Sequence, residues 1–330
     1  MLDGVRAMAG AVLASWGNQL GGTFLLPGST FSLGALAASL VLFVLLAVPV
    51  QRKVRLKVLR RALFPKRILT SASGRTDLAY FVGGILMSGL LIGWALFSAE
   101  QVRGFVQGWT GAPPALRVPH WLAAPIATLA LYLAYEFAYW LDHWLMHRVP
   151  LFWHVHKVHH QAESLSLFTN GRVHPLETIG FANIVALCTG LTAVLLDQLL
   201  GHVDPWTIGG TNLLVMLFAV MVSHLQHSHL WLSFGPFWGR ILLGPAHHQI
   251  HHSADPAHFN RNLGASLALF DRLFGTFHMP AAKRETLRFG VDDEETAPHG
   301  ARAALVAPVT AIAGDIARGV RGRPGPLPAA

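Results

Sequence analysis

Charged residues are scarce in this chain. They make up 13% of its 330 residues, against about 25% in an ordinary soluble protein. Apolar residues make up 52%, and Cys188 is the single cysteine. One cysteine excludes an intramolecular disulfide and leaves too few thiolates for an iron–sulfur cluster. The balance of apolar and charged residues is typical of an integral membrane protein.

Motifs for bound redox cofactors are also missing. We find no glycine-rich turn between a strand and a helix, which is the signature of NAD or flavin binding. A redox reaction in this chain would therefore take its electrons from a separate protein.

Long apolar runs are what the sequence does contain. Five of them have 18 to 21 residues, close to the roughly 20 that a membrane-spanning helix needs. The last two are short and can instead form a hairpin that only dips into the membrane. The sequence thus predicts an all-α integral membrane protein with four to five membrane-embedded helices. The runs are Leu33–Val50, Leu78–Phe97, Trp121–Leu141, Ile179–Leu196 and Trp206–Ser223.

Positive charge is concentrated in one loop, where eight Lys or Arg residues lie between Arg52 and Arg67. The positive-inside rule places this loop in the cytoplasm. We expect it to face anionic lipid and expect no nucleic-acid partner, because no soluble domain presents it. Counting spans from this loop places residues 143–174 and 224–258 on the same, cytoplasmic side. The predicted location is a bacterial inner membrane or an equivalent membrane.

The two ends differ from the middle of the chain. Residues 1–32 form either an interfacial helix or a loop, and the sequence does not decide between them. Residues 33–296 form the expected membrane domain. Residues 297–330 are rich in Ala, Pro, Gly and Arg, and we expect them to be poorly ordered.

Histidine is the most informative residue type. Fifteen of the nineteen histidines lie in residues 143–174 and 224–258. Spacings of three and four residues place side chains on one helix face. Imidazole is a good ligand for iron, zinc and copper, so this repeated spacing predicts a site for two metal ions. Three tight clusters carry it: His143 and His147; His156, His159 and His160; His248, His251 and His252.

The clustered histidines favour a metalloenzyme, and two other interpretations compete with this one. A lone histidine at a helix end is usually a packing residue, but eight in matching patterns are not explained in that way. A membrane metal transporter or metal-binding protein would carry ionisable residues through several spans, and the predicted spans contain one, Glu136. Tyr132, Tyr135 and Tyr139 share its helix face, and we favour a helix-packing role for this stripe over a substrate tunnel wall.

These residues also carry a resemblance to a known family. The run from Tyr139 to Glu177, together with PAHHQIHHS and NRNLGASLALFDRLFGTF further on, resembles the membrane-bound fatty acid hydroxylase/sterol desaturase superfamily. The similarity covers roughly residues 135 to 278. Eight residues separate His147 from His156, a shorter gap than in the acyl-CoA desaturases. Trp144, His229 and Phe270 depart from the family's usual pattern and leave the subfamily open.

The resemblance implies a membrane anchor beneath a cytosolic helical cap that holds two Fe ions. Members use O2 to hydroxylate, desaturate or demethylate lipids, so it implies an oxidoreductase. Sterol, carotenoid, fatty acyl chain and polar lipid all remain possible substrates. A ferredoxin, or a cytochrome with its reductase, would supply electrons. The implied ligands are His143, His147, His156, His159, His160, His248, His251 and His252, with His174 and His227 as additions. Which of His224, His227 and His229 binds metal stays open.

Carboxylates should surround such a site, because neutral histidines leave the metal charge uncompensated. We expect them to orient the ring N–H groups. Asp142, Glu177 and Asp271 are the acids that we assign to the catalytic site. Glu163 and Asp255 are further candidates. For each acid, an ordinary helix cap or surface charge is the alternative.

Overall fold

The computed structural model describes residues 2–29, 31–51, 65–91, 96–114, 118–291 and 299–320. In these ranges the chain is mostly helical, with one short hairpin formed by β1 (Thr207–Ile208) and β2 (Thr211–Asn212). Most of the basic loop, residues 52–64, lies outside the described residues.

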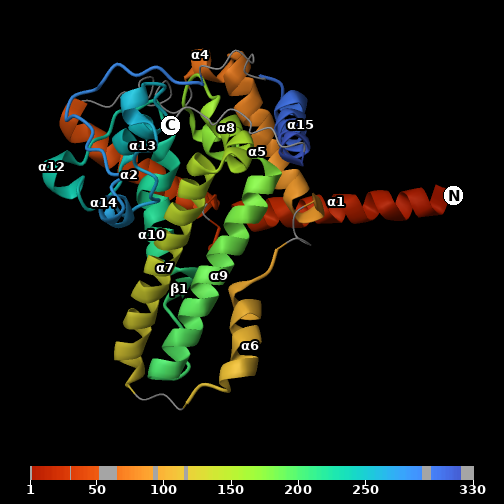
Figure 1. The fold of residues 1–330 in the computed structure, drawn as a ribbon, viewed down its shortest axis with the longest axis vertical. Coiled ribbons are helices and arrows are strands. Elements are labelled where there is room, and N and C mark those ends of the chain that lie inside the picture. The colour runs from red at the N-terminus through yellow and green to blue at the C-terminus, as the bar shows by residue number, and fades with distance from the viewer. Residues whose placement is uncertain are drawn as a thin grey trace.

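Two long helices form the axis of the molecule: α7 (His120–Arg148) and α9 (Pro175–Leu200). They pack side by side (Figure 1). Both are long and apolar enough to cross a membrane, and they contain the predicted third and fourth spans. The 29 residues of α7 extend about 43 Å, which exceeds the roughly 30 Å of a hydrocarbon core. If α7 stands upright across a bilayer, one end therefore projects beyond the hydrocarbon core.

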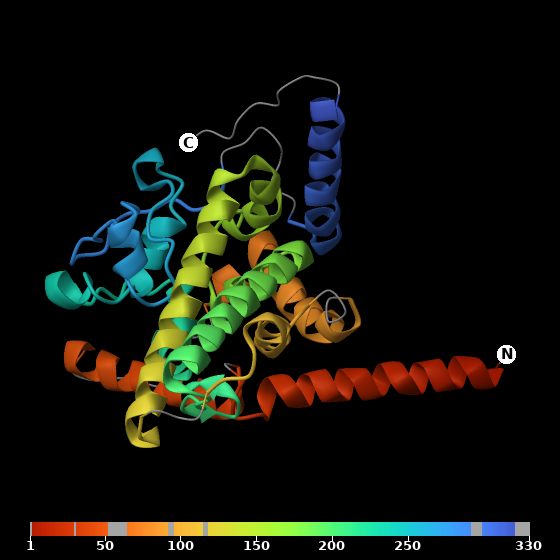
Figure 2. The same cartoon turned by 60° about the horizontal axis from the view of Figure 1, so that its bottom comes forward.

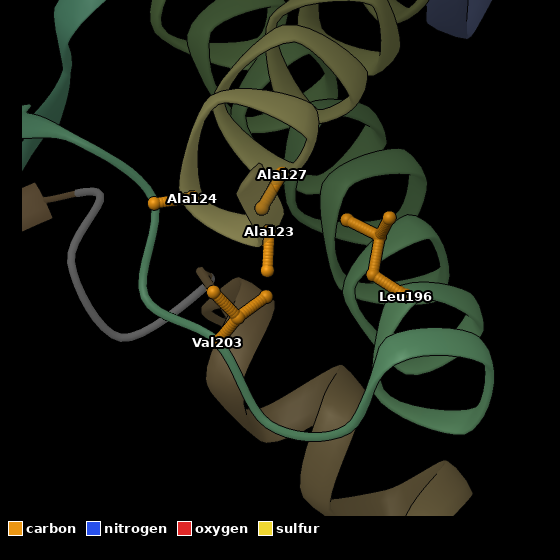
Figure 3. Packing of buried hydrophobic residues seen from close by; sticks show 5 residues of the cluster. All are labelled: Ala123, Ala124, Ala127, Leu196 and Val203. Carbon is orange, nitrogen blue, oxygen red and sulfur yellow. The ribbon is translucent and has the colours of Figure 1, made fainter. Parts of the chain in front are cut away.

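Small residues bring the far ends of these helices together. Ala123, Ala124 and Ala127 of α7 are fully buried against Leu196 of α9 and Val203 (Figure 3). Small side chains allow close backbone approach, which is how helices pack where the hydrophobic effect between them is weak.

Of the other three predicted spans, the first two are largely helical and the fifth is not one long helix. Helices α2 (Leu33–Gln51) and α5 (Ala72–Leu91) cover most of the first two, although residues 92–95 are outside the described ranges. The fifth, Trp206–Ser223, is not a span-length helix. It begins with the β-hairpin, whose turn is made by Gly209 and Gly210 at positive φ. It continues as α10 (Leu213–Phe218) and a π-helical turn, η3 (Ala219–Ser223), which leads into α11 (His224–Gln226).

The N-terminal segment is a helix, α1 (Leu2–Phe24), which resolves the choice between helix and loop. It runs crosswise to α7 and α9 (Figure 2). The short α4 (Lys66–Leu69) leads into α5, and α6 (Ala99–Thr110) packs along α9. Arg103 of α6 binds both carboxylate oxygens of the buried Asp197 of α9 at 2.6 Å.

Short helices gather at the projecting end of α7 and form a cap (Figure 1). Pro150 starts α8 directly after α7 ends, so the chain turns sharply there. The cap elements are α8 (Pro150–His160), η2 (Leu167–Gly171), α12 (Gly235–Trp238), α13 (Pro245–His251), η4 (Pro256–His258) and α14 (Leu269–Leu273).

The expectation of a poorly ordered tail is wrong for residues 301–320, which form helix α15 (Ala301–Val320). Ala304 is fully buried with Tyr80 of α5 and Val158 of α8. Asp315 accepts a hydrogen bond from the ring of His154 at 2.7 Å. These partners lie well over a hundred residues away, so the composition of the segment could not reveal them.

Candidate metal centre

Nine histidines converge in the cap as two groups. Within each group the ring nitrogens that face inward lie within 4.8 Å of one another. All nine side chains are buried or nearly so. Site A consists of His143, His147, His156, His160 and His251; site B consists of His159, His227, His248 and His252.

Each of the two three-histidine motifs gives two histidines to one site and one to the other. On α8, His156 and His160 serve site A and His159 serves site B; on α13 and its C-terminal cap, His248 and His252 serve site B and His251 serves site A. Consecutive helix residues point about 100° apart, so adjacent histidines such as His159 and His160 face different sites. The two sites are therefore held side by side by the same helices.

Distances between the inward nitrogens fit metal ligation. In site A, the Nε2 atom of His156 lies 3.1 Å from that of His143 and 3.2 Å from that of His160. In site B, Nε2 of His227 lies 3.0 Å from that of His159, and Nε2 of His252 lies 3.1 Å from that of His248. The Nε2 atoms of His227 and His248 are slightly closer, at 2.8 Å. Two nitrogens bound at about 2.1 Å to one ion, at roughly right-angled to tetrahedral geometry, would be about 3.0–3.4 Å apart.

Unsatisfied atoms point to the same conclusion. Among the described residues, Nε2 of His147 and Nε2 of His251 are buried without a hydrogen-bond partner. A buried polar atom normally finds a partner. A metal ion in site A would satisfy both atoms, so the donor set fits a bound ion.

Backbone acceptors fix the outer ring nitrogens of three of these histidines. Nδ1 of His143 donates to the Leu263 carbonyl at 2.8 Å, and Nδ1 of His251 donates to the Arg261 carbonyl at 2.9 Å. Nδ1 of His159 donates to the Arg172 carbonyl at 3.2 Å. Each acceptor requires the proton on Nδ1, which leaves the Nε2 lone pair directed into the site.

Burial keeps these histidines neutral, the form that binds metal. It lowers the pKa of His159 to about 3 and the pKa of His156 well below its usual value. The same cause lowers the pKa of the other ligands outside the long helices, which are His160, His227, His248, His251 and His252.

The predicted carboxylates take different positions. Glu177 accepts a hydrogen bond from Nδ1 of His156 at 2.8 Å, so it orients a ligand directly. Asp142 is buried, with Oδ1 unpartnered among the described residues. Among the described residues, no hydrogen bond joins Asp271 to a histidine. Its oxygens accept hydrogen bonds from the backbone N–H groups of Leu263 and Gly264, both at 2.8 Å, and so fix the loop that holds His143.

The other two candidate acids are an ordinary helix cap and a surface charge. Asp255 caps η4 by accepting a hydrogen bond from the Ala257 N–H at 2.9 Å. Glu163 binds the ring of His299 at 2.8 Å at the protein surface.

His174 is a correction, because the structure does not bring it into either site. Its Nδ1 accepts a hydrogen bond from the Leu176 N–H, which makes it the N-cap of α9. Its Nε2 faces the Leu305 carbonyl at 3.1 Å. Both nitrogens are occupied in these roles. Of the three histidines between 224 and 229, His227 is the one in site B.

From the sequence we did not predict that the loop after α13 positions two of the site histidines. Asn260 and Asn262 adopt positive φ values of 58° and 56°, a conformation that Asn tolerates better than most residues. Between and after them, the carbonyls of Arg261 and Leu263 turn toward His251 and His143. Asn residues in the NRNLG motif were the available signal.

A buried ion pair was also missed. Arg172 is fully buried and binds Asp77 of α5 at 3.0 Å and the Val158 carbonyl of α8 at 2.6 Å. It thereby fixes the backbone whose carbonyl holds His159. Asp77 and Arg172 are 95 residues apart, and no local pattern connects them.

Glu136 joins α7 to the same region. It accepts hydrogen bonds from the backbone N–H groups of Ser266 at 3.1 Å and Leu267 at 2.9 Å. Tyr135 and Tyr139 of the same stripe pack on Phe181 of α9. These contacts agree with a packing role for the stripe.

Two helices long and apolar enough to cross a membrane thus lie beneath a cap with two adjacent groups of histidines that could each hold a metal ion. Residues 128–276 match the family model described as fatty acid hydroxylase. This segment contains every residue of sites A and B. The matched segment is less than half of the chain, and its similarity to the fatty acid hydroxylase family agrees with the resemblance that the motifs predicted.

Curated relatives carry related names. The chain is 26% identical over 142 residues to an alkylglycerol monooxygenase of Caenorhabditis elegans, covering 43% of the chain and 25% of that protein. It is 29% identical over 170 residues to the ornithine lipid hydroxylase OlsE of Rhizobium tropici, covering 50% and 46%. It is 28% identical over 145 residues to the Delta(7)-sterol 5(6)-desaturase ERG3A of Gibberella zeae, covering 43% and 34%.

The chain thus spans less than half the length of each of these relatives. No solved structure matches it.

Proposed function

We propose that the chain is a membrane-bound oxygenase that hydroxylates a lipid with O2, two iron ions and electrons from another protein. Desaturation of the lipid is the second outcome that the same site supports, since one relative is named a desaturase. The observation that carries the proposal is the pair of adjacent histidine sites at the end of two helices of membrane-spanning length.

Sites A and B would hold one ion each. Bound iron supplies the dioxygen and C–H chemistry that amino-acid side chains cannot perform. Zinc has no redox chemistry, so the oxidoreductase names of the relatives favour iron.

The protein's own residues hold the ligands in place. The carbonyls of Arg172, Arg261 and Leu263 keep the protons on the outer nitrogens, so each ring presents its Nε2 atom to the site. Glu177 does the same for His156. Burial of the cluster excludes water from competing for these positions.

The substrate is proposed to be a lipid that enters from the bilayer. The relatives are named for alkylglycerol, ornithine lipid and sterol. Sterols, carotenoids, fatty acyl chains and polar lipids stay within the proposal. Exposed apolar side chains on α7, such as Leu122 and Leu129, face the membrane below the cap. On the charge argument, the cap and its metal centre lie on the cytoplasmic side.

A separate donor is proposed to deliver the electrons. The chain has one cysteine and no nucleotide-binding motif, so a ferredoxin, or a cytochrome with its reductase, is the class of partner expected. Metal transport is not favoured. Glu136, the acid within a predicted span, is engaged by Ser266 and Leu267.

Lipid mass spectrometry of a host with and without the protein tests the proposal. A lipid that gains the mass of one oxygen atom indicates hydroxylation, and one that loses two hydrogen atoms indicates desaturation. The product should require O2 and disappear in His156→Ala but persist in His154→Ala, whose histidine binds Asp315 instead of metal. Metal-dependent ion flux in vesicles without O2 consumption or lipid change would contradict the proposal.

A further inference from the structure

The short helices α12 and α14 form one unit. The Ala268 N–H donates to the Ile241 carbonyl at 2.9 Å, and the Arg272 side chain donates to the Arg240 carbonyl at 3.3 Å. The unit presents six large apolar side chains, each between 41% and 67% exposed. We call this surface the aromatic platform; it consists of Phe237, Trp238, Ile241, Leu269, Leu273 and Phe274.

The platform lies at a defined level along α7. Phe270 packs on Phe137 with ring centres 5.4 Å apart, and Phe274 stacks on Trp140 at 4.3 Å. Nineteen residues separate Trp121 from Trp140, a rise of about 28 Å. This is close to the roughly 30 Å of a hydrocarbon core. If the core begins near Trp121, the platform sits at its boundary on the cap side.

One face of α7 runs into the platform. Leu122, Ile126 and Leu129 are exposed at helical spacing, and the same stripe continues to Phe137 and Trp140. There Phe270 and Phe274 cover it. Beyond that point, exposed Leu269 and Leu273 take over as the apolar surface. The platform therefore continues an exposed apolar face of α7.

The charges on the platform are positive. Arg240 and Arg272 are exposed, whereas Asp271, the acid in these two segments, is fully buried and bound to backbone N–H groups. Aromatic rings concentrate at the membrane–water interface, and arginine is attracted to anionic headgroups. This combination matches a lipid surface.

We infer that the aromatic platform inserts into the leaflet at the cap end of α7, with Arg240 and Arg272 on anionic lipid headgroups. The aromatic platform is thereby a further membrane contact, after the last predicted span. It fixes the height of the metal centre above the bilayer. The inference depends on α7 crossing the membrane and is independent of the proposed oxygenase activity.

Site-directed spin labelling of the full chain tests the platform. Cys188 is the single cysteine, so Cys188→Ser gives a background without cysteine. Phe237→Cys and Leu273→Cys place labels on the platform, and Leu129→Cys places one on the exposed face of α7. Lys283→Cys places one on an exposed residue of the loop that follows α14. The protein is reconstituted in vesicles of phosphatidylethanolamine and phosphatidylglycerol without any partner protein.

Collisions of the label with O2, which partitions into lipid, are compared with collisions with a water-soluble nickel chelate. We expect Phe237→Cys and Leu273→Cys to favour O2 several-fold, as Leu129→Cys does, and Lys283→Cys to favour the chelate. Chelate-accessible labels at both platform positions, in variants with unchanged metal content, would overturn the inference. That result would instead identify the platform as a docking surface for an acidic donor protein.

Discussion

Neighbouring histidines on α8 have opposite roles, and this distinction can be tested one residue at a time. His156 belongs to site A and is held by Glu177, whereas His154 faces Asp315 of α15. We expect His156→Ala to lower the metal content by at least one ion per chain. His154→Ala should keep both ions and cost at most about 1 kcal/mol, as is usual for a partly exposed ion pair. Elemental analysis of the purified variants would show the difference. Equal metal loss in both would mean that α8 is oriented differently.

Asp271 acts on the metal centre through the backbone. Replacing it with Asn puts an N–H donor where one carboxylate oxygen now accepts from Leu263 or Gly264. Leaving a buried N–H unpaired costs about 1–3 kcal/mol, so the free energy of unfolding should fall by that order. The loop that holds His143 should also loosen and weaken metal binding in site A.

Asp255→Asn is the matched control for Asp271→Asn. Asp255 caps a short helix, and Asn caps a helix about as well as Asp. Its unfolding curve and metal affinity should therefore match those of the unmodified chain. If Asp271→Asn is equally silent, the loop is held by other contacts.

At the scale of single elements, α15 provides a direct test of docking. Ala304 is buried against Tyr80 and Val158, whereas Val306 on the same helix is 52% exposed. Ala304→Asp would bury an unpaired charge, which is costly enough to undock the helix. We expect faster amide hydrogen exchange over residues 301–320 in Ala304→Asp, and unchanged exchange in Val306→Asp. Equal exchange in the two variants would contradict the packing described.

The elements that the sequence predicted well are those with strong local patterns. Helical spacing of three and four residues picked out eight of the nine histidines that the structure brings together, because the pattern and the helix have the same period. Residues that depend on distant partners were not predictable. His174 follows the family pattern but caps α9, and Arg172 holds His159 through a pairing with Asp77, 95 residues away.

At the scale of the whole molecule, the buried histidines make the metal-free protein sensitive to acid. Their pKa values are lowered in the folded state, from an unfolded value of about 6.5. Below that pH the unfolded chain binds protons that the folded chain does not, so stability falls as the pH falls. Each histidine contributes up to about 1.4 kcal/mol per pH unit.

Thermal unfolding of chelator-treated protein, measured at several pH values, would check this sensitivity. We expect the melting temperature to be flat above about pH 6.5 and to drop steeply below it. A melting temperature that rises on acidification would contradict this sensitivity.

Counting metal ions tests the central claim, that sites A and B are two adjacent metal sites in one chain. The measurement is elemental analysis of protein prepared anaerobically and reconstituted with ferrous iron, normalised to chain concentration. Two separate histidine sets, each with converging nitrogens, predict about two irons per chain. A single ion per chain after full reconstitution would contradict the two-site arrangement.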